Sequence, residues 1–151
     1  MKNKIKPVLA FLLLFLSGCM TIRAGDIKIV DAWAQATLLA YSEKMSEHAY
    51  HIPVGSDTAV YFQIVNEGQV EDSLIEGFSD VCEKVEIIGA EGNEIRLLPG
   101  EKVVLSPKTG LSIRLRNLNQ DLLPSQKINI TLIFKNQGQV ELLVPVKLPQ
   151  N

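Results

Sequence analysis

Residues 111–116 read Leu-Ser-Ile-Arg-Leu-Arg, a strict alternation of apolar and polar side chains. Because successive side chains of a strand point to opposite faces, this pattern predicts a strand whose three apolar residues face a core and whose serine and two arginines face outward. Such a strand belongs to a sheet that is buried on one face and exposed on the other.

Other strand patterns lie on both sides of this one. They are rich in β-branched and aromatic residues, and they cover residues 27–34, 58–65, 73–78, 81–88, 93–98, 102–105, 127–134 and 139–146. The last two flank Asn136-Gln137-Gly138, which predicts a hairpin. Pro145 has no N–H for a strand ladder, so we expect the final strand to lie at a sheet edge or to end there. About eight short strands of this kind predict an all-β protein, a Greek-key barrel or sandwich.

One segment does not follow the strand pattern. Residues 37–56 are rich in helix-compatible residues and contain few turn residues before Pro53 and Gly55. We therefore expect a short, partly helical insertion after the first strand.

Length and composition limit the class of protein. The chain has 151 residues, 46% of them hydrophobic, and a formal net charge of −2, which fits a single domain with a core of its own. The near-neutral charge argues against a nucleic-acid-binding protein, and no apolar run reaches the roughly 20 residues of a membrane-spanning helix. The sequence contains no nucleophile with a plausible base, no phosphate-binding loop and no paired acids, so we expect no enzymatic activity.

The N-terminus has the pattern of a secretion signal. Three lysines within the first six residues precede a short apolar stretch, residues 7–16, which ends in Leu16-Ser17-Gly18-Cys19. This ending resembles the lipobox of bacterial lipoproteins. The resemblance implies a signal peptide at 1–18, acylation of Cys19, a lipidated tether at 19–26 and a β domain at 27–148. The alternatives are an ordinary signal peptide that is cleaved nearby and a Ser-Gly-Cys sequence that occurs by chance.

A lipoprotein signal places the protein in the bacterial cell envelope, anchored by lipid and facing the periplasm. Loss of the three signal-peptide lysines changes the formal net charge from −2 to about −5. With Cys19 acylated, Cys82 is the one remaining thiol of the chain, in an oxidising compartment.

Several stretches resemble the periplasmic copper chaperones known as PCu(A)C. They are Asp31-Ala32-Trp33-Ala34 in the first strand, residues 59–68 in the second, Glu83-Lys84-Val85-Glu86, the Pro-Gly turn within 97–105, and the closing strand with Val140-Glu141 and Val144-Pro145-Val146. They occur in the family's order and cover most of the mature chain. The resemblance implies a cupredoxin-like Greek-key barrel and, as the family's function, the handling of Cu(I).

The family's copper ligands are not carried over. Members bind Cu(I) with two His and two Met, arranged as His, then Met, then His-x-Met. The resemblance places the first His at Ile88 and the His-x-Met pair at Ser112 and Arg114. Isoleucine and serine offer no soft ligand, and the permanent charge of arginine opposes a cation. The sequence also has no Met between Ile88 and Ser112.

Two other sets of soft ligands remain. Met45, His48 and His51 lie at three-residue spacing, so a local helix would place them along one side, and thioether with imidazole suits Cu(I). Cys82 lies close in sequence to the lost site, its thiolate would bind Cu(I) tightly, and strand alternation allows it partial exposure. The simpler alternatives are a polar loop with incidental histidines and a cysteine that only packs in the core.

Three functions remain open. The first is a membrane-tethered copper chaperone that binds Cu(I) at the Met45, His48 and His51 set and passes it to an acceptor protein. The second is a metal-free family member that serves as a protein-interaction module in the envelope. The third is a Zn or Cu(II) binder that uses His48 and His51. The expected partners are the membrane, through the lipid, and an envelope protein or copper acceptor, with no nucleic acid.

Overall fold

The computed structural model describes residues 27–36 and 51–148. The strands in these ranges are β1 (Ile27–Gln35), β2 (Thr58–Asn66), β3 (Asp72–Phe78), β4 (Cys82–Ile88), β5 (Ile95–Leu97), β6 (Lys102–Leu105), β7 (Ser112–Leu118), β8 (Lys127–Phe134) and β9 (Gly138–Lys147). A short 3-10 turn, η1, covers Glu91–Asn93. Every stretch with a strand pattern in the sequence is therefore a strand, and the hairpin predicted at the last turn is formed by β8 and β9.

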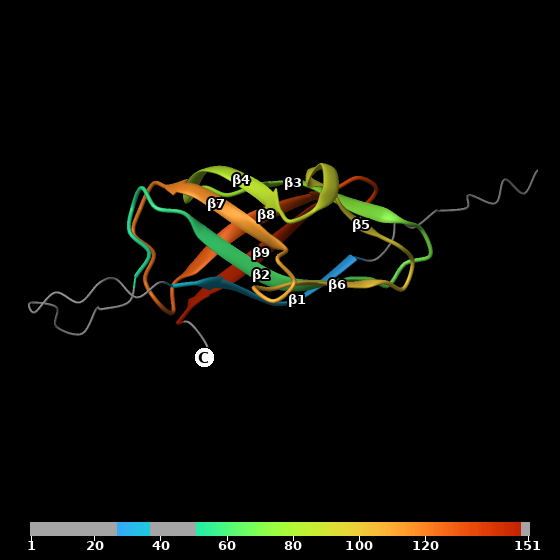
Figure 1. The fold of residues 1–151 in the computed structure, drawn as a ribbon, viewed down its shortest axis with the longest axis horizontal. Coiled ribbons are helices and arrows are strands. Elements are labelled where there is room, and N and C mark those ends of the chain that lie inside the picture. Colours follow the sequence, from blue (N-terminus) through green and yellow to red (C-terminus); the bar gives the residue numbers. More distant parts are fainter. Residues whose placement is uncertain (1–26, 37–50, 149–151) are drawn as a thin grey trace, which may run out of the picture.

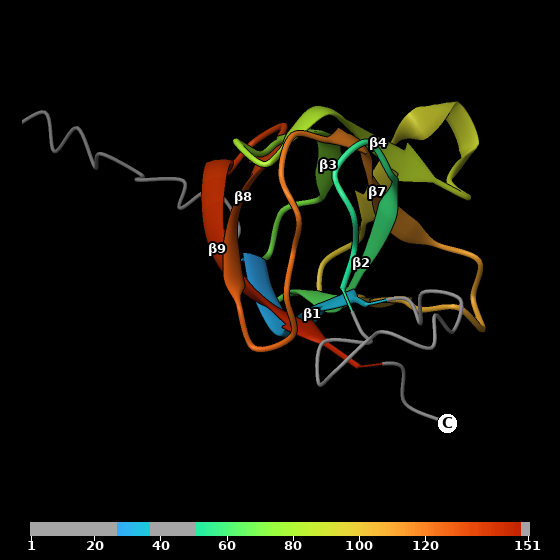
Figure 2. The same ribbon diagram turned by 90° about the vertical axis from the view of Figure 1, so that its left-hand side faces the viewer.

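The strands curve into a nearly closed barrel (Figure 1). Hydrogen-bonded neighbours follow the order β4-β7-β2-β1-β9-β8-β3-β5. In addition, β2 pairs with β7 through residues 58–60 and with β6 through residues 62–65. Figure 2 looks along the barrel and shows β3 and β4 on either side of a seam that no ladder closes. The all-β, cupredoxin-like barrel that the resemblance implied is confirmed.

Inward-facing aliphatic and aromatic side chains fill the barrel. The alternation predicted for residues 111–116 is confirmed at Ile113 and Leu115, which are fully buried. The same alternation runs along β2 and β8, where the buried apolar residues are Val60, Phe62, Ile64, Ile128, Ile130, Leu132 and Phe134. Because the core takes one face of each strand, the other face is left to form surface sites.

A β-bulge at Asp31 sets which side chains of β1 face outward. The ladder with β2 slips between Val30 and Trp33, and Asp31 has a φ of 56°, in the left-handed region. Aspartate enters this region more readily than most residues. Since the extra residue changes the phase of the strand, Trp33 lies against Tyr61 with ring centroids 5.0 Å apart, while Ala34 is buried.

Substitution of Asp31 by Val is expected to destabilise the protein by about 1–2 kcal/mol, because a β-branched side chain resists a positive φ. Asp31→Asn should cost less, since asparagine tolerates this conformation. Urea unfolding followed by circular dichroism measures both changes. A Val variant as stable as the native chain would contradict a bulge that depends on this residue.

The expectation that Pro145 puts the last strand at an edge, or ends it, is wrong. β9 lies between β8 and β1 and continues to Lys147. The N–H of Val146 donates to the carbonyl oxygen of Gln126, on the β8 side, at 2.8 Å. Backbone groups alternate between the two sides of a strand, so the nitrogen of Pro145 faces β1. Because β1 pairs with β9 at Val146 and Lys147, the missing N–H costs no ladder bond.

Two further expectations concern the segments between strands. β5 is shorter than the predicted 93–98, because Asn93 ends the η1 turn with a φ of 57°. The predicted partly helical insertion lies mostly in 37–50, outside the described residues, and 51–57 contains one isolated bridge, from Ile52 to Leu122. In 27–36 and 51–148 we find no helix with the length and apolar character needed to cross a membrane.

Candidate functional site

The positions where the resemblance puts the copper ligands meet on the outer face of the β4–β7 pair. Ile88, at the end of β4, is the ladder partner of Ser112, at the start of β7. Arg114 follows two residues later on the same face, with Glu86 of β4 and Ala59 of β2 as its partners. Strand pairing thus gathers three positions that lie far apart in the sequence.

These three side chains do not fit a copper ion. Isoleucine has no donor atom, a serine hydroxyl is a hard ligand, and arginine is a permanent cation. Ser112 lies on the outer face as predicted, yet it is 5% exposed. The loops beside it pack tightly, since a Cβ on Gly89 would lie 2.3 Å from the carbonyl oxygen of Gly110. Within the described ranges, no three His, Cys, Asp or Glu side chains form a group that could hold a metal.

An ion-pair network covers the neighbouring part of this face. Arg116 donates from Nε to Glu86 at 2.7 Å and from Nη1 to Asp57 at 2.5 Å. Lys84 contacts Glu86 at 2.8 Å. The hydrogen bonds from Lys84 and Arg116 lower the pKa of Glu86. The pKa of Asp57 is lowered first by the N–H of Asn117 and then by Arg116. Two cations and two carboxylates therefore compensate one another in this network.

Arg114 forms no ion pair in this network, although its charge also helps to lower the pKa of Asp57. Its Nε is buried and has no hydrogen-bond partner among the described residues, and the ion pairs of that part of the chain do not include it. Arg114 lines a hollow of about 160 Å³, which we call the Arg114 pocket, together with Gln35, Asp57, Thr58 and Ala59. Ala59 is the ladder partner of Arg114, and its short side chain leaves this space open.

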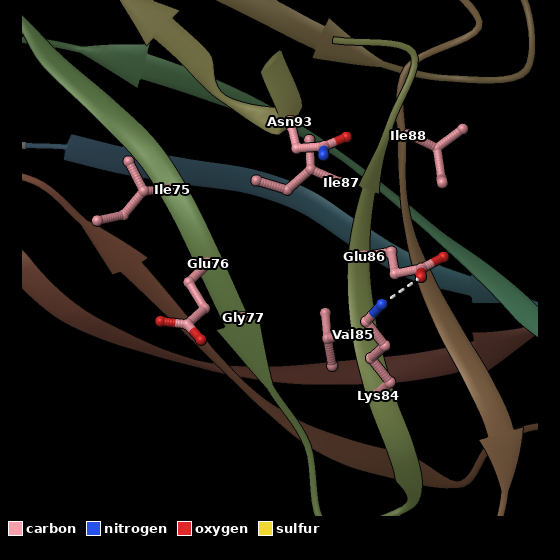
Figure 3. A pocket seen from close by; sticks show the side chains of 9 residues that line it. All are labelled: Ile75, Glu76, Gly77, Lys84, Val85, Glu86, Ile87, Ile88 and Asn93. Atoms are coloured by element: carbon pink, nitrogen blue, oxygen red, sulfur yellow. Dashed lines mark ion pairs between the residues drawn. The ribbon is translucent and has the colours of Figure 1, made fainter. Parts of the chain in front are cut away.

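A second hollow follows the open seam between β3 and β4 (Figure 3). Its volume is about 280 Å³, and its walls are Ile75, Glu76, Gly77, Lys84, Val85, Glu86, Ile87, Ile88 and Asn93. In the middle of the seam the side chain of Val85 packs against the backbone of Gly77, so closely that a Cβ placed on Gly77 would lie 2.9 Å from Val85 Cγ1. The walls mix apolar and charged side chains and contain no soft metal ligand.

Cys82 is buried, so the partial exposure that strand alternation allowed is wrong. The residue is 8% exposed, and its Sγ donates to the carbonyl oxygen of Lys84 at 3.4 Å. Burial raises the pKa of the Cys82 thiol, and this makes the thiolate, the form that binds metals, scarce. Its role as a ligand stays a prediction that its surroundings do not favour.

Of the Met45, His48 and His51 set, His51 lies in the described part of the chain, where it is half-buried. Met45, His48 and the lipid-attachment residue Cys19 lie outside the described residues. The structure therefore neither brings the three proposed ligands together nor separates them, and the set stays a prediction.

The ends of the undescribed segment 37–50 are firmly placed on the barrel. The N–H of Ala36 donates to the carbonyl oxygen of Lys147 at 2.8 Å, and Ile52 exchanges backbone hydrogen bonds with Leu122 at 2.9 and 2.8 Å. Both junctions lie at the end of the barrel opposite Ile27, where β1 begins (Figure 1).

Strand alternation predicted that Arg114 and Arg116 face outward on the same strand, and the structure gives the two side chains different surroundings. Arg116 is paired with carboxylates 30 and 59 positions away in the chain. Alternation places two arginines on one face, but it does not reveal partners on other strands. It also missed the Arg114 pocket, since nothing in the sequence marks Gln35 or Thr58 as its neighbours.

Comparisons with known proteins agree with this fold. Residues 27–146 match the family model of LpqE-like lipoproteins, and no curated protein matches the chain. The apo PCuAC domain from PmoF1 is similar with a TM-score of 0.66 and 21% identity, over 83% of this chain and 97% of that one. The copper-bound PCuAC domain from PmoF2 gives 0.63 and 25%, over 83% and 96%.

A third solved structure, CuI-DR1885 from Deinococcus radiodurans, is more distant. Its TM-score is 0.51 at 16% identity, over 87% of this chain and 83% of that one. All three share the barrel, and the family match covers every described strand but the last residue of β9. The chain belongs to the LpqE-like lipoprotein family and has the fold of PCuAC domains.

Proposed function

We propose that the protein is a lipid-anchored, copper-chaperone-like protein of the bacterial envelope that binds Cu(I) through Met45, His48 and His51 and performs no catalysis. One observation carries the proposal: the chain keeps the fold of copper-binding domains but has no soft donor at their ligand positions on β4 and β7. A copper site in this protein therefore needs other residues. Residues 45–51 contain both histidines of the chain and a methionine.

The chemistry of these side chains supports copper as cargo. The PmoF2 domain and DR1885 were both solved with copper, and the barrel resembles theirs. Thioether and imidazole are ligands that Cu(I) prefers, and a site with few ligands can release the ion to a partner. The proposal moves this ligand type from the strands to the segment between β1 and β2.

The barrel also has a suitable geometry for a tethered carrier. The proposed tether, residues 19–26, spans at most about 28 Å when extended, and it joins the barrel at Ile27. β1 runs along the barrel for nine residues, so the end of β1 and the chain that follows residue 50 lie at the opposite end (Figure 1). A tether at Ile27 would therefore hold that end of the barrel near the membrane and leave the end with the 36 and 51 junctions accessible to an acceptor protein.

A Cu(I) titration against a colorimetric chelator tests the proposal. The mature chain carries Cys19→Ser, so that Cys82 is its one thiol, and the titration is run under reducing conditions. We expect a Kd below about 1 nM, weakened at least 100-fold, or about 2.7 kcal/mol, by the combined change of Met45, His48 and His51 to Ala. Cys82→Ser should leave the affinity unchanged. Binding that survives the combined change and is lost in Cys82→Ser would overturn the proposed site.

The second candidate function is a metal-free interaction module of the envelope. It is favoured by the lack of a metal-ligand group among the described residues and by the ion pairs that occupy the outer face of β4 and β7. This candidate predicts that the native chain does not compete for Cu(I) at all. A preference for Zn or Cu(II) that depends on His48 and His51 would instead support the third hypothesis.

A further inference from the structure

The Arg114 pocket contains a buried hydrogen-bond donor that lacks an acceptor. In the described part of the chain, Arg114 Nε is the one buried side-chain nitrogen or oxygen without a hydrogen bond. A buried donor without a partner is unfavourable, most of all when it belongs to a charged group. An acceptor that binds the guanidinium would remove this penalty.

The other polar groups of the pocket do not accept a hydrogen bond from this donor. The carboxylate of Asp57 accepts from Arg116 Nη1 and, at 3.0 Å, from the N–H of Asn117. The hydroxyl of Thr58 donates to the backbone oxygen of Gln35 at 3.0 Å. Neither group accepts a hydrogen bond from Arg114 Nε, although the charge of Arg114 acts on Asp57 and helps to lower its pKa.

The charge balance of the face also favours an anion. Three cations, Lys84, Arg114 and Arg116, face two carboxylates, Glu86 and Asp57, so this part of the face carries one excess positive charge. The side-chain amide of Gln35 makes no hydrogen bond within the described residues and can therefore donate beside Arg114. An anion at this place would have two different donors.

The shape of the donors selects the class of anion. The planar fork of arginine matches the two oxygens of a carboxylate and also the oxygens of a phosphate. A doubly charged phosphate would lie beside the Asp57 carboxylate and be repelled by it, whereas a singly charged carboxylate is repelled less. A hollow of about 160 Å³ has room for a carboxyl group and a short stem.

We propose that the Arg114 pocket binds a carboxylate group, with the Arg114 guanidinium and the Gln35 side-chain amide as donors. The carboxylate belongs to a small free acid or to an acidic side chain of a polypeptide. This site uses none of the proposed copper ligands, and it lies on the same face as the Ile88–Ser112 pair. The test of this carboxylate site therefore does not depend on whether the proposed copper function is correct.

Nuclear magnetic resonance of the arginine Nε–H groups tests the proposal directly. The uniformly ¹⁵N-labelled mature chain with Cys19→Ser is titrated with sodium acetate against sodium chloride of equal ionic strength. We expect a saturable shift of the Arg114 Nε–H signal, with a Kd of about 10 mM or tighter, and no saturable shift of the Arg116 signal. Arg114→Lys assigns the signal by removing it. Gln35→Ala should weaken acetate binding several-fold.

Further titrations distinguish a free acid from an acidic side chain of a polypeptide as the source of the carboxylate, and they provide the controls. N-acetyl-glutamate N-methylamide carries a side-chain carboxylate on a peptide unit, and the glutamine analogue is its uncharged match. Tighter binding of the glutamate compound than of acetate indicates a polypeptide ligand, and equal binding indicates a free acid. Arg116→Lys should leave the Arg114 response intact. An Arg114 signal that stays unshifted by acetate, or that shifts equally with the glutamine analogue, would overturn the carboxylate site.

Discussion

A variant with Ile88→His, Ser112→His and Arg114→Met is expected to bind Cu(I) with a Kd below about 1 nM, which is roughly 12 kcal/mol of binding free energy. Ile88 and Ser112 are ladder partners, and opposite residues of an antiparallel pair have Cβ atoms about 4.5–5.5 Å apart. Two imidazoles at these positions can therefore share one ion. A thioether at position 114 lies on the same face and replaces a repelling charge with a soft ligand.

The experiment is run in a background with Met45, His48 and His51 changed to Ala, so that any affinity arises at the strands. Competition with a colorimetric Cu(I) chelator under reducing conditions gives the Kd. Arg114→Met alone, in the same background, is the matched control, because it removes the charge without adding imidazole and should leave Cu(I) unbound. Failure of the three-residue variant to bind, with its circular dichroism unchanged, would contradict the view that side chains alone abolished this site.

A positive result would separate two explanations for the missing copper ligands. One explanation is that the backbone closes over the position, as the close approach of Gly89 to Gly110 suggests; the other is that only the side chains differ. Recovery of Cu(I) binding would show that the barrel still holds the ligand geometry. The backbone of the barrel would then still permit copper binding, and the change of function would lie in the side chains of β4 and β7.

The strands were predictable from the sequence because their alternation is local. Residues 111–116 predicted the buried Ile113 and Leu115 of β7, and the turn at Asn136-Gln137-Gly138 predicted the β8–β9 hairpin. The place of β9 was not predictable, because the cost of Pro145 depends on which neighbour its nitrogen faces. That neighbour, β1, lies more than a hundred residues earlier in the chain.

The candidate site was predictable in part for the same reason. The resemblance identified Ile88, Ser112 and Arg114, and strand register confirms that they meet. Burial of Ser112 and the pairing of Arg116 with Asp57 depend on loops and strands that are distant in the sequence. Period-2 patterns specify the face on which a side chain lies, but not what lies on top of it.

Substitution of Asp72 by Ala is expected to lower the free energy of unfolding by about 3–5 kcal/mol, which shifts the melting temperature by roughly 15 °C. Asp72 is 1% exposed. Its carboxylate accepts from the backbone N–H groups of Ser73 at 2.7 Å and of Asn136 and Gln137, each at 2.9 Å. Alanine leaves all three N–H groups without this acceptor, and the N–H of Ser73, a residue that is 3% exposed, is the one most shielded from water.

The same carboxylate determines how the N-terminal end of the barrel is held. Gln137, positioned by Asp72, accepts through Oε1 from the N–H of Ile27 at 2.6 Å, so loss of Asp72 should also loosen the start of β1. Urea unfolding measures the stability, and hydrogen exchange at Ile27 measures the local effect.

Asp80→Ala, at an exposed carboxylate, should change stability by less than about 0.5 kcal/mol. Asp72→Asn should fall between the two, because its amide keeps one acceptor oxygen and presents an NH₂ group to the remaining donor. An Asp72→Ala variant as stable as Asp80→Ala would mean that the β8–β9 turn holds itself without the buried carboxylate.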